Sequence, residues 1–201
     1  MTTKRDSNQK SLINLSAYYG VQQVWKKLDM LNSRQWMEYR NDLAGSEVFS
    51  QTEMDNITID TDWQKVIFRN APIANYELSL NGGNEKTKFF LSGNLFDQQG
   101  TVIGSDYNRI NGRVNIDHNI SEKLMVGTSL GLTYAKTDRI EGDQSLHGPL
   151  PNGISTPAIY PVYNTDGSYN QDGPYSNAVS IANEAINQNF SFRSIGNTYL
   201  N

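Results

Sequence analysis

The sequence has 201 residues, enough for one or two ordinary domains, and its 17 basic and 21 acidic residues give a formal net charge of only −4. It contains no Lys/Arg cluster, which argues against a nucleic-acid partner, and no run approaching 18 apolar residues, so it predicts no transmembrane helix. Cysteine is absent, which excludes disulfides and thiolate metal sites.

The first third of the chain predicts one strand and two helices. Apolar and polar residues alternate over 11–24, which is typical of an amphipathic strand. The period then changes to that of a helix within 33–44, with Ser33 placed to cap it and Gly45 placed to end it. A second, short helix is predicted at 62–68. The buried stripe of the longer helix is predicted to hold Trp36, Tyr39 and Leu43.

The middle of the chain predicts four more amphipathic strands, each about ten residues long. They cover residues 74–82, 86–96, 107–117 and 123–136. A stretch rich in Pro, Gly, Asn and Tyr follows over 137–187, with a short helix near 179–186, and strand character returns at 190–200. The facing of this last strand is ambiguous, because Phe192 and Ile195 fall on opposite sides.

The connections between these strands alternate in length, which favours an up-and-down barrel in an outer membrane. Such barrels have short periplasmic turns, long extracellular loops and tilted strands of about 9–11 residues. The alternation therefore predicts turns at 82–85 and 118–122 on the periplasmic side. The predicted extracellular loops are 25–73, 97–106 and 138–188.

A soluble β-sandwich that binds carbohydrate or protein is the alternative, because its strands also alternate between apolar and polar residues. The alternation of apolar and polar residues is the same in both architectures, so it does not distinguish between them. Strand length favours the barrel, since soluble strands usually have about 5–6 residues. The polar faces also carry cationic and small residues, as a wet lumen would: Lys86, Lys88, Arg109, Arg113 and Asn115.

Several segments resemble the SusC/RagA-like TonB-dependent outer-membrane transporters. The specific part runs from Tyr76 to Asn115, and the similarity covers nearly the whole chain. Thr2–Arg5 looks like the last strand of the family's plug domain, and Ser16–Gln22 is similar to its first barrel strand. The other matching segments are Asp62–Trp63, Ile67–Arg69, Ala71–Pro72, Tyr76–Ser79, Gly82–Lys88, Gly100–Arg109, Arg113–Asn115 and Val126–Gly127.

The resemblance implies a 22-stranded barrel closed by an N-terminal plug, which TonB energises through the plug region. It implies import of glycans, or of peptides in some members, together with a SusD-type surface lipoprotein. Residues 1–10 would then be the end of the plug domain, and 11–201 the N-terminal portion of the transmembrane barrel. Since the family's signal peptide, TonB box and most of its plug are missing, we expect a fragment or a truncated reading frame.

Candidate binding residues lie in the long loop 138–188. Aromatic rings stack on the apolar faces of sugars, and carboxylates and amides bond hydroxyl groups, so this loop suits glycan capture or contact with a partner protein. The alternative is packing of the loops against one another at the barrel mouth. The candidates are Tyr160, Tyr163, Asp166, Tyr169 and Tyr175.

The sequence predicts neither an enzyme, nor a cofactor, nor a metal site. His118 and His147 are expected in different connections on opposite membrane sides, and Asp143 lies four residues from His147 in a segment without helix pattern. Asp166 lies in a Gly-rich loop that lacks the regular ligand spacing of a calcium loop, which favours a plain turn. The cationic side chains predicted to face the lumen are expected to pack against the plug.

Overall fold

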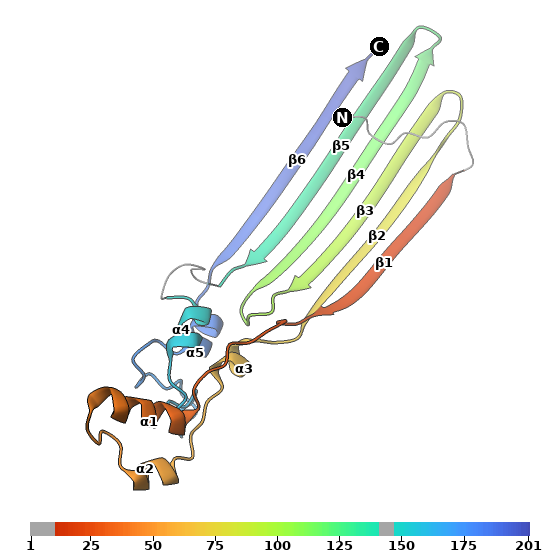
Figure 1. The fold of residues 1–201 in the computed structure, drawn as a ribbon. Coiled ribbons are helices and arrows are strands. Elements are labelled where there is room, and N and C mark those ends of the chain that lie inside the picture. The colour runs from red at the N-terminus through yellow and green to blue at the C-terminus, as the bar shows by residue number, and fades with distance from the viewer. Residues whose placement is uncertain (1–10, 141–146) are drawn as a thin grey trace.

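The computed structural model describes residues 11–140 and 147–201, and its six strands form one antiparallel sheet in chain order (Figure 1). The predicted all-β meander is therefore confirmed, and so is the pairing of the strands predicted at 86–96 and 107–117. The prediction that residues 1–10 are the end of a plug domain concerns residues that the structure does not describe. The strands are β1 (Leu12–Gln22), β2 (Ala71–Gly83), β3 (Thr87–Gln99), β4 (Asp106–Ser121), β5 (Leu124–Asp138) and β6 (Gln188–Leu200).

Five strands, β2 to β6, are longer than the sequence predicts, reaching 16 residues in β4, whereas β1 ends at Gln22 and is shorter than the predicted 11–24. In β3 the extra residues are polar ones at the strand end. Asp97, Gln98 and Gln99 pair with Asn108, Tyr107 and Asp106, so the β3–β4 ladder continues beyond the alternating pattern. The connections accordingly cover 23–70, 84–86, 100–105, 122–123 and 139–187.

The two faces of the sheet differ in chemistry, and the leucines of the apolar face are exposed. Register places Leu15, Leu78 and Leu132 on the same face, and each is at least 40% exposed. The opposite face carries the predicted polar set, including Asn115, which is only 4% exposed. Within the described residues no second sheet covers the apolar face. The predicted facing is confirmed for Phe89, Leu91, Val114, Ile116, Val126, Leu130 and Leu132 and, on the other face, for Lys88, Arg109, Arg113 and Asn115.

Aromatic side chains mark the end of the apolar face that lies nearer the helices. Tyr76, Tyr134 and Phe192 share one row of the ladder, named here the aromatic row. The next row towards the helices carries Lys136, and the apolar residues continue the other way to Val126. The nine residues of β5 from Val126 to Tyr134 span about 31 Å along the strand, or about 23 Å along the membrane normal at a tilt of about 40°, close to the apolar band of outer-membrane barrels.

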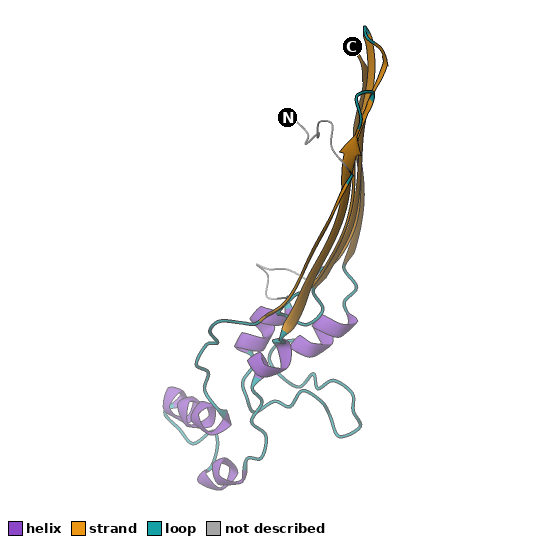
Figure 2. Cartoon of the chain, turned by 90° about the vertical axis from the view of Figure 1, so that its right-hand side faces the viewer, coloured by secondary structure: helices purple, strands orange, loops and turns teal. Residues whose placement is uncertain are grey.

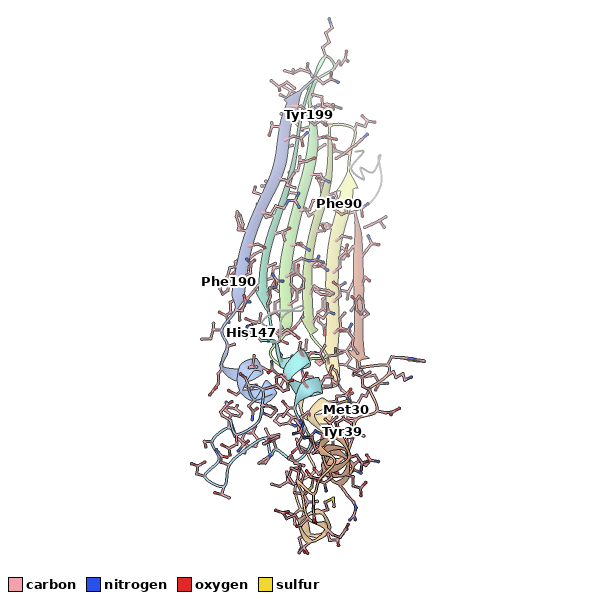
Figure 3. All side chains as sticks on the ribbon, turned by 60° about the vertical axis from the view of Figure 1, so that its left-hand side comes forward. Met30, Tyr39, Phe90, His147, Phe190 and Tyr199 are labelled. Carbon is pink, nitrogen blue, oxygen red and sulfur yellow. The ribbon has the colours of Figure 1, made fainter. Side chains whose placement is uncertain are left out.

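The facing of β6, which the sequence left open, follows from its register with β5. Phe190, Phe192 and Leu200 pair with the outward residues of β5, whereas Ile195 pairs with Gly131 on the polar face. Phe190 and Tyr199 lie near opposite ends of this strand (Figure 3).

We expect a polypeptide limited to these 201 residues to aggregate in water. Six strands cannot close, since the smallest known transmembrane barrels have eight, and both sheet edges would present unpaired backbone groups beside an exposed apolar face. Size-exclusion chromatography with light scattering of the refolded chain measures this. A monodisperse monomer with a cooperative melt, in the absence of detergent, would contradict it.

Five short helices lie beyond one end of the sheet (Figures 1 and 2). They are α1 (Ser33–Ala44), α2 (Gln51–Asn56), α3 (Trp63–Ile67), α4 (Pro149–Ser155) and α5 (Ala178–Glu184). The helices predicted at 33–44, 62–68 and 179–186 are present, whereas the sequence analysis missed α2 and α4. In the described part of the chain, none of the helices has the length and apolar character needed to span a membrane.

Two details of α1 differ from the prediction. Its N-cap is Asn32 rather than Ser33, because Asn32 accepts the backbone N–H of Gln35 while the Gln35 side chain accepts the N–H of Asn32. Its buried side chains are Ser33 and Met37. The predicted stripe of Trp36, Tyr39 and Leu43 is wrong, since Tyr39 and Leu43 are exposed and Trp36 is half-buried against Phe49.

Candidate functional site

The long connections meet at the helical end of the sheet and share a small apolar core. Trp63 and Ile67 of α3 pack with Ala178 and Val179 of α5, and Ile67 is fully buried. The connection 100–105 joins the same core through Ile103, whose backbone N–H donates to the Ile67 carbonyl at 3.0 Å. We name the packed segments 61–68, 100–105 and 149–184 the loop assembly. Figure 2 shows it below the thin, curved sheet.

Arg69 holds the connection 100–105 in place. Its Nε donates to the Gly100 carbonyl at 2.9 Å, and its Nη2 donates to the Ser105 carbonyl at 3.0 Å and to Asp106 Oδ1 at 2.7 Å. Three acceptors on one half-buried guanidinium fix the end of β3 relative to the start of β4. Gly104 then takes a positive φ of 82°, and its Cα passes against the Ala182 carbonyl of α5.

The five loop residues that the sequence singled out divide by burial. Tyr160 and Tyr169 are half-buried and pack against the loop core, as the packing alternative expects. Tyr163 is 51% exposed and Tyr175 is 40% exposed. The rings of Tyr163 and Tyr169 stack with their centroids 5.3 Å apart, so Tyr169 supports Tyr163 from the core side.

Asp166 lies at an exposed turn. Its Oδ1 accepts the Ser168 hydroxyl at 2.6 Å and the Ser168 backbone N–H at 2.9 Å, and these bonds lower the pKa of the Asp166 carboxyl. Gly167 supplies the left-handed conformation between them, at φ 84°. Asp172 accepts the Asn170 side chain at 2.9 Å. In residues 11–140 and 147–201 no cluster of three or more His, Asp or Glu side chains could hold a metal ion.

His147 lies in a connection, as predicted, whereas His118 does not. His118 lies in β4 and not in a connection, and its Nδ1 is 2.7 Å from the Thr87 hydroxyl across the β3–β4 ladder. His147 is exposed just before α4 (Figure 3), and Asp143 is outside the described residues.

A cavity of about 500 Å³ lies beside the loop core, and the sequence analysis missed it. Residues 27–32 form one wall, held by Gln64, whose side chain accepts the Leu28 N–H at 2.9 Å and donates to the Leu28 carbonyl at 2.7 Å. Residues 153–158 form another wall, held by the bond from Trp63 Nε1 to the Pro157 carbonyl at 3.2 Å. Gln64 is 4% exposed, and the sequence alone does not indicate that burial.

The polar face of the sheet carries a ladder of amides and cations. Asn94 Nδ2 donates to Asn75 Oδ1 at 2.7 Å, and Asn111 Nδ2 donates to Asn94 Oδ1 at 3.2 Å. Arg109 lies over the Phe96 ring, 5.3 Å from its centroid. Lys88, Arg113 and Asn115 share this face, whereas Lys86 lies in the β2–β3 turn.

At the end of the polar face that is farthest from the helices, the ring of Tyr199 in β6 lies over Gly127 of β5. Its hydroxyl donates to Asp117 Oδ1 at 2.7 Å, which links β6 to β4 across β5. A Cβ at position 127 would collide with the Tyr199 ring, so the glycine leaves room for the aromatic ring. Several side chains of the polar face are thus hydrogen-bonded to one another across the strands.

An antiparallel meander with an exposed apolar face, a hydrogen-bonded polar face and long loops at one end is a segment of a large transmembrane β-barrel. No family model matches the sequence. The chain is similar, however, to three curated proteins that are each named a TonB-dependent receptor, and it spans about a fifth of their length.

The P3 receptor of Formosa agariphila is 28% identical, over 94% of this chain and 19% of its own. The P26 receptor of the same organism is 30% identical, over 100% of this chain and 21% of its own length. SusC of Bacteroides thetaiotaomicron is 26% identical, over 98% of this chain and 19% of its own length.

Solved structures show the same fold. The RagAB peptide transporter matches with a TM-score of 0.78 at 17% identity, over 98% of this chain and 27% of that chain. The closed-closed state of the RagAB peptide importer matches with a TM-score of 0.75 at 18% identity, over 98% and 27%. The resemblance to SusC/RagA-like TonB-dependent transporters is therefore confirmed over nearly the whole chain.

Proposed function

We propose that this chain supplies the first barrel strands and first extracellular loops of a TonB-dependent outer-membrane transporter. It would import glycans or peptides with a SusD-type surface lipoprotein, TonB acting through the plug region. The observation that carries the proposal is the inverted burial of the sheet, with its leucines exposed and Asn115 buried, together with the similarity to receptors of that name. Transport, and not catalysis, is the activity proposed.

The proposal includes an orientation. The connections 23–70, 100–105 and 139–187 would face the outside, and the turns 84–86 and 122–123 the periplasm. The polar face would line the lumen and contact the plug through Lys88, Arg109, Arg113 and Asn115. Residues 1–10 would lead from the plug into β1. The aromatic row would then lie at the outer membrane surface, beneath the loop assembly.

Within the loop assembly, we propose Tyr163 and Tyr175 as the residues that contact the substrate or the lipoprotein. Both rings are exposed, whereas Tyr160 and Tyr169 pack against the core. The stacked Tyr169 ring holds Tyr163 rigidly, which lowers the entropy lost when a ligand binds. The Asp166 turn lies between Tyr163 and Tyr169, which pair with one another as an isolated β-bridge, and its carboxylate accepts the Ser168 hydroxyl.

The test uses the full-length receptor that carries this segment. Cells should take up one nutrient class, glycan or peptide, and lose that uptake when either the receptor or TonB is removed. Uptake unaffected by both deletions would overturn the transporter proposal. Recovery of the lipoprotein with the affinity-tagged receptor tests the partner separately.

We expect the double variant Tyr163→Ala, Tyr175→Ala to weaken ligand capture or lipoprotein recovery about tenfold, which corresponds to about 1.4 kcal/mol. The barrel should still assemble, because both rings lie outside the strand ladder. Tyr39→Ala is the matched control, since Tyr39 is similarly exposed but lies on α1. An unchanged uptake rate and unchanged complex recovery would assign these rings to packing alone.

A further inference from the structure

Hydrogen bonds on several sides fix the shape of the cavity beside the loop core. The Gln64 side chain holds one wall, and the Thr61 N–H donates to the Ala158 carbonyl at 2.9 Å. The Ser33 N–H donates to Asp60 Oδ1 at 2.8 Å, which ties the start of α1 to a residue of the lining. Because these walls are already in place, a ligand that enters the cavity has little protein to order.

Several apolar side chains of the cavity are exposed instead of packed. Leu28, Met30 and Leu31 line it from the segment between β1 and α1, and each is at least 47% exposed. Figure 3 shows Met30 at the end of the sheet where the helices lie. Trp36 adds an aromatic wall, and Arg40 lies over its ring, 5.7 Å from the centroid. The cavity thus offers apolar surface that a ligand with a hydrocarbon portion would cover.

The charged side chains of the cavity are mainly acidic. They are Asp29, Asp60 and Asp62, against Lys27 as the cationic residue of the lining. In the part of the chain that the structure describes, none of these three carboxylates forms a salt bridge. Asp60 and Asp62 each accept one backbone N–H through Oδ1, the donor to Asp62 being Lys65, so both keep free acceptor capacity. The cavity therefore attracts positive charge.

We propose that this cavity binds the side chain of a lysine or arginine in a substrate peptide. The inference rests on the proposed transport function and names peptides, and not neutral glycans, as the substrate class.

The chemistry of the two side chains matches the lining of the cavity. Lysine and arginine join a hydrocarbon stem to a cationic head, so the stem would cover Leu28, Met30 and Leu31 while the head pairs with Asp60 and Asp62. A neutral sugar would hydrogen-bond to the carboxylates but leave their charge uncompensated. The cavity volume of about 500 Å³ lies within the range of about 300–1,000 Å³ that holds small ligands, which favours a short peptide over the surface of a folded partner.

Calorimetric titration of the full-length receptor in detergent with the tripeptides Ala-Lys-Ala and Ala-Gln-Ala tests the proposal. The two probes have the same termini and differ in the charge of the central side chain. We expect Ala-Lys-Ala to bind about fivefold more tightly, the effect of a partly exposed ion pair. The double variant Asp60→Asn, Asp62→Asn should lose this preference, because asparagine keeps an oxygen acceptor for both backbone N–H groups but carries no charge.

Asp42→Asn, Glu47→Gln is the matched control. It removes the same charge from two exposed residues of the same connection, and neither residue lines the cavity. Its preference for Ala-Lys-Ala should equal that of the wild type. Asp29→Asn is a second test variant, because the Asp29 side chain makes no hydrogen bond within the described residues and its replacement leaves the walls intact. It should also weaken the binding of Ala-Lys-Ala.

The outcomes separate the cavity from the transport function. Equal affinity of the wild type for the two tripeptides would overturn the proposal, as would equal affinity of the wild type and Asp60→Asn, Asp62→Asn for Ala-Lys-Ala. Loss of lipoprotein recovery in that variant, with unchanged tripeptide affinity, would assign the cavity to a basic side chain of the lipoprotein and overturn the substrate assignment. Nutrient uptake that persists without the receptor, while the purified receptor still prefers Ala-Lys-Ala, would overturn the transport function and leave the cation preference of the cavity standing.

Discussion

Replacing Leu130 with arginine in the full-length barrel is expected to destabilise it by about 2–4 kcal/mol, the effect of a cation near the bilayer midplane. Leu130 lies on the exposed apolar face, opposite Val114 and Gly196. It is four residues from Tyr134 of the aromatic row, about 13 Å along the strand, which is close to the centre of the apolar band. The fraction of heat-modifiable, folded barrel on a gel, followed across a urea series, measures the effect.

Ser129→Arg is the control for this prediction. Ser129 is the adjacent residue of β5 and faces the polar side, opposite Asn115 and Asn197, where an arginine stays in contact with water or polar groups. Because the side-chain period of a strand is two, a one-residue change inverts the environment. Equal folded fractions for Leu130→Arg and the wild type would contradict a lipid-facing Leu130.

The strands could be predicted because their signal is local. In β2 and β5 successive residues alternate between the apolar and the polar face of the sheet, so Leu78, Leu80, Leu130 and Leu132 stand out in the sequence alone. The strand ends could not be predicted in the same way. Gln98 and Gln99 belong to β3 only because Tyr107 and Asp106 lie opposite them, which is a property of the register.

The helices α2 and α4 were not predicted, for two different reasons. The capping box of α2, Ser50 with Glu53, is present in the sequence and could have been used. The helix α4 has no comparable signal, since it contains Pro149, Pro151 and Gly153. It forms because it packs between α3 and α5, with Gly153 fitting against Ile67, and this contact joins residues 86 positions apart.

The candidate site was only partly predictable for the same reason. The aromatic character of the loop was visible in the sequence, but Tyr160 and Tyr169 are half-buried against a core shared with another loop, whereas Tyr163 and Tyr175 are exposed. The alternation of apolar and polar residues correctly predicted that Arg109 and Arg113 lie on the polar face. It could not place Lys86, which falls in a turn where the strand period ends.

The loop assembly depends most on Ile67, so Ile67→Ala is expected to destabilise it by about 2–5 kcal/mol, the usual effect of removing a large buried aliphatic side chain. Ile67 is fully buried, packs with Trp63 and Ala178, and contacts Gly153. Since these contacts lie outside the strand ladder, the loss should open the loops and leave the barrel folded. Hydrogen exchange in the full-length receptor should rise in 149–158 and 178–184 and stay constant in β3 and β4.

Val66→Ala separates this effect from a general loss of apolar volume in α3. Val66 is the neighbouring residue and is 37% exposed, so its truncation leaves no enclosed cavity, and exchange in 149–158 should remain close to that of the wild type. Because Tyr160 and Tyr169 pack on the same core, Ile67→Ala should also disturb the exposed Tyr163 that Tyr169 supports. Ligand capture should therefore fall in Ile67→Ala and persist in Val66→Ala. Equal hydrogen exchange and equal ligand capture in the two variants would mean that the loops are held by contacts other than this core.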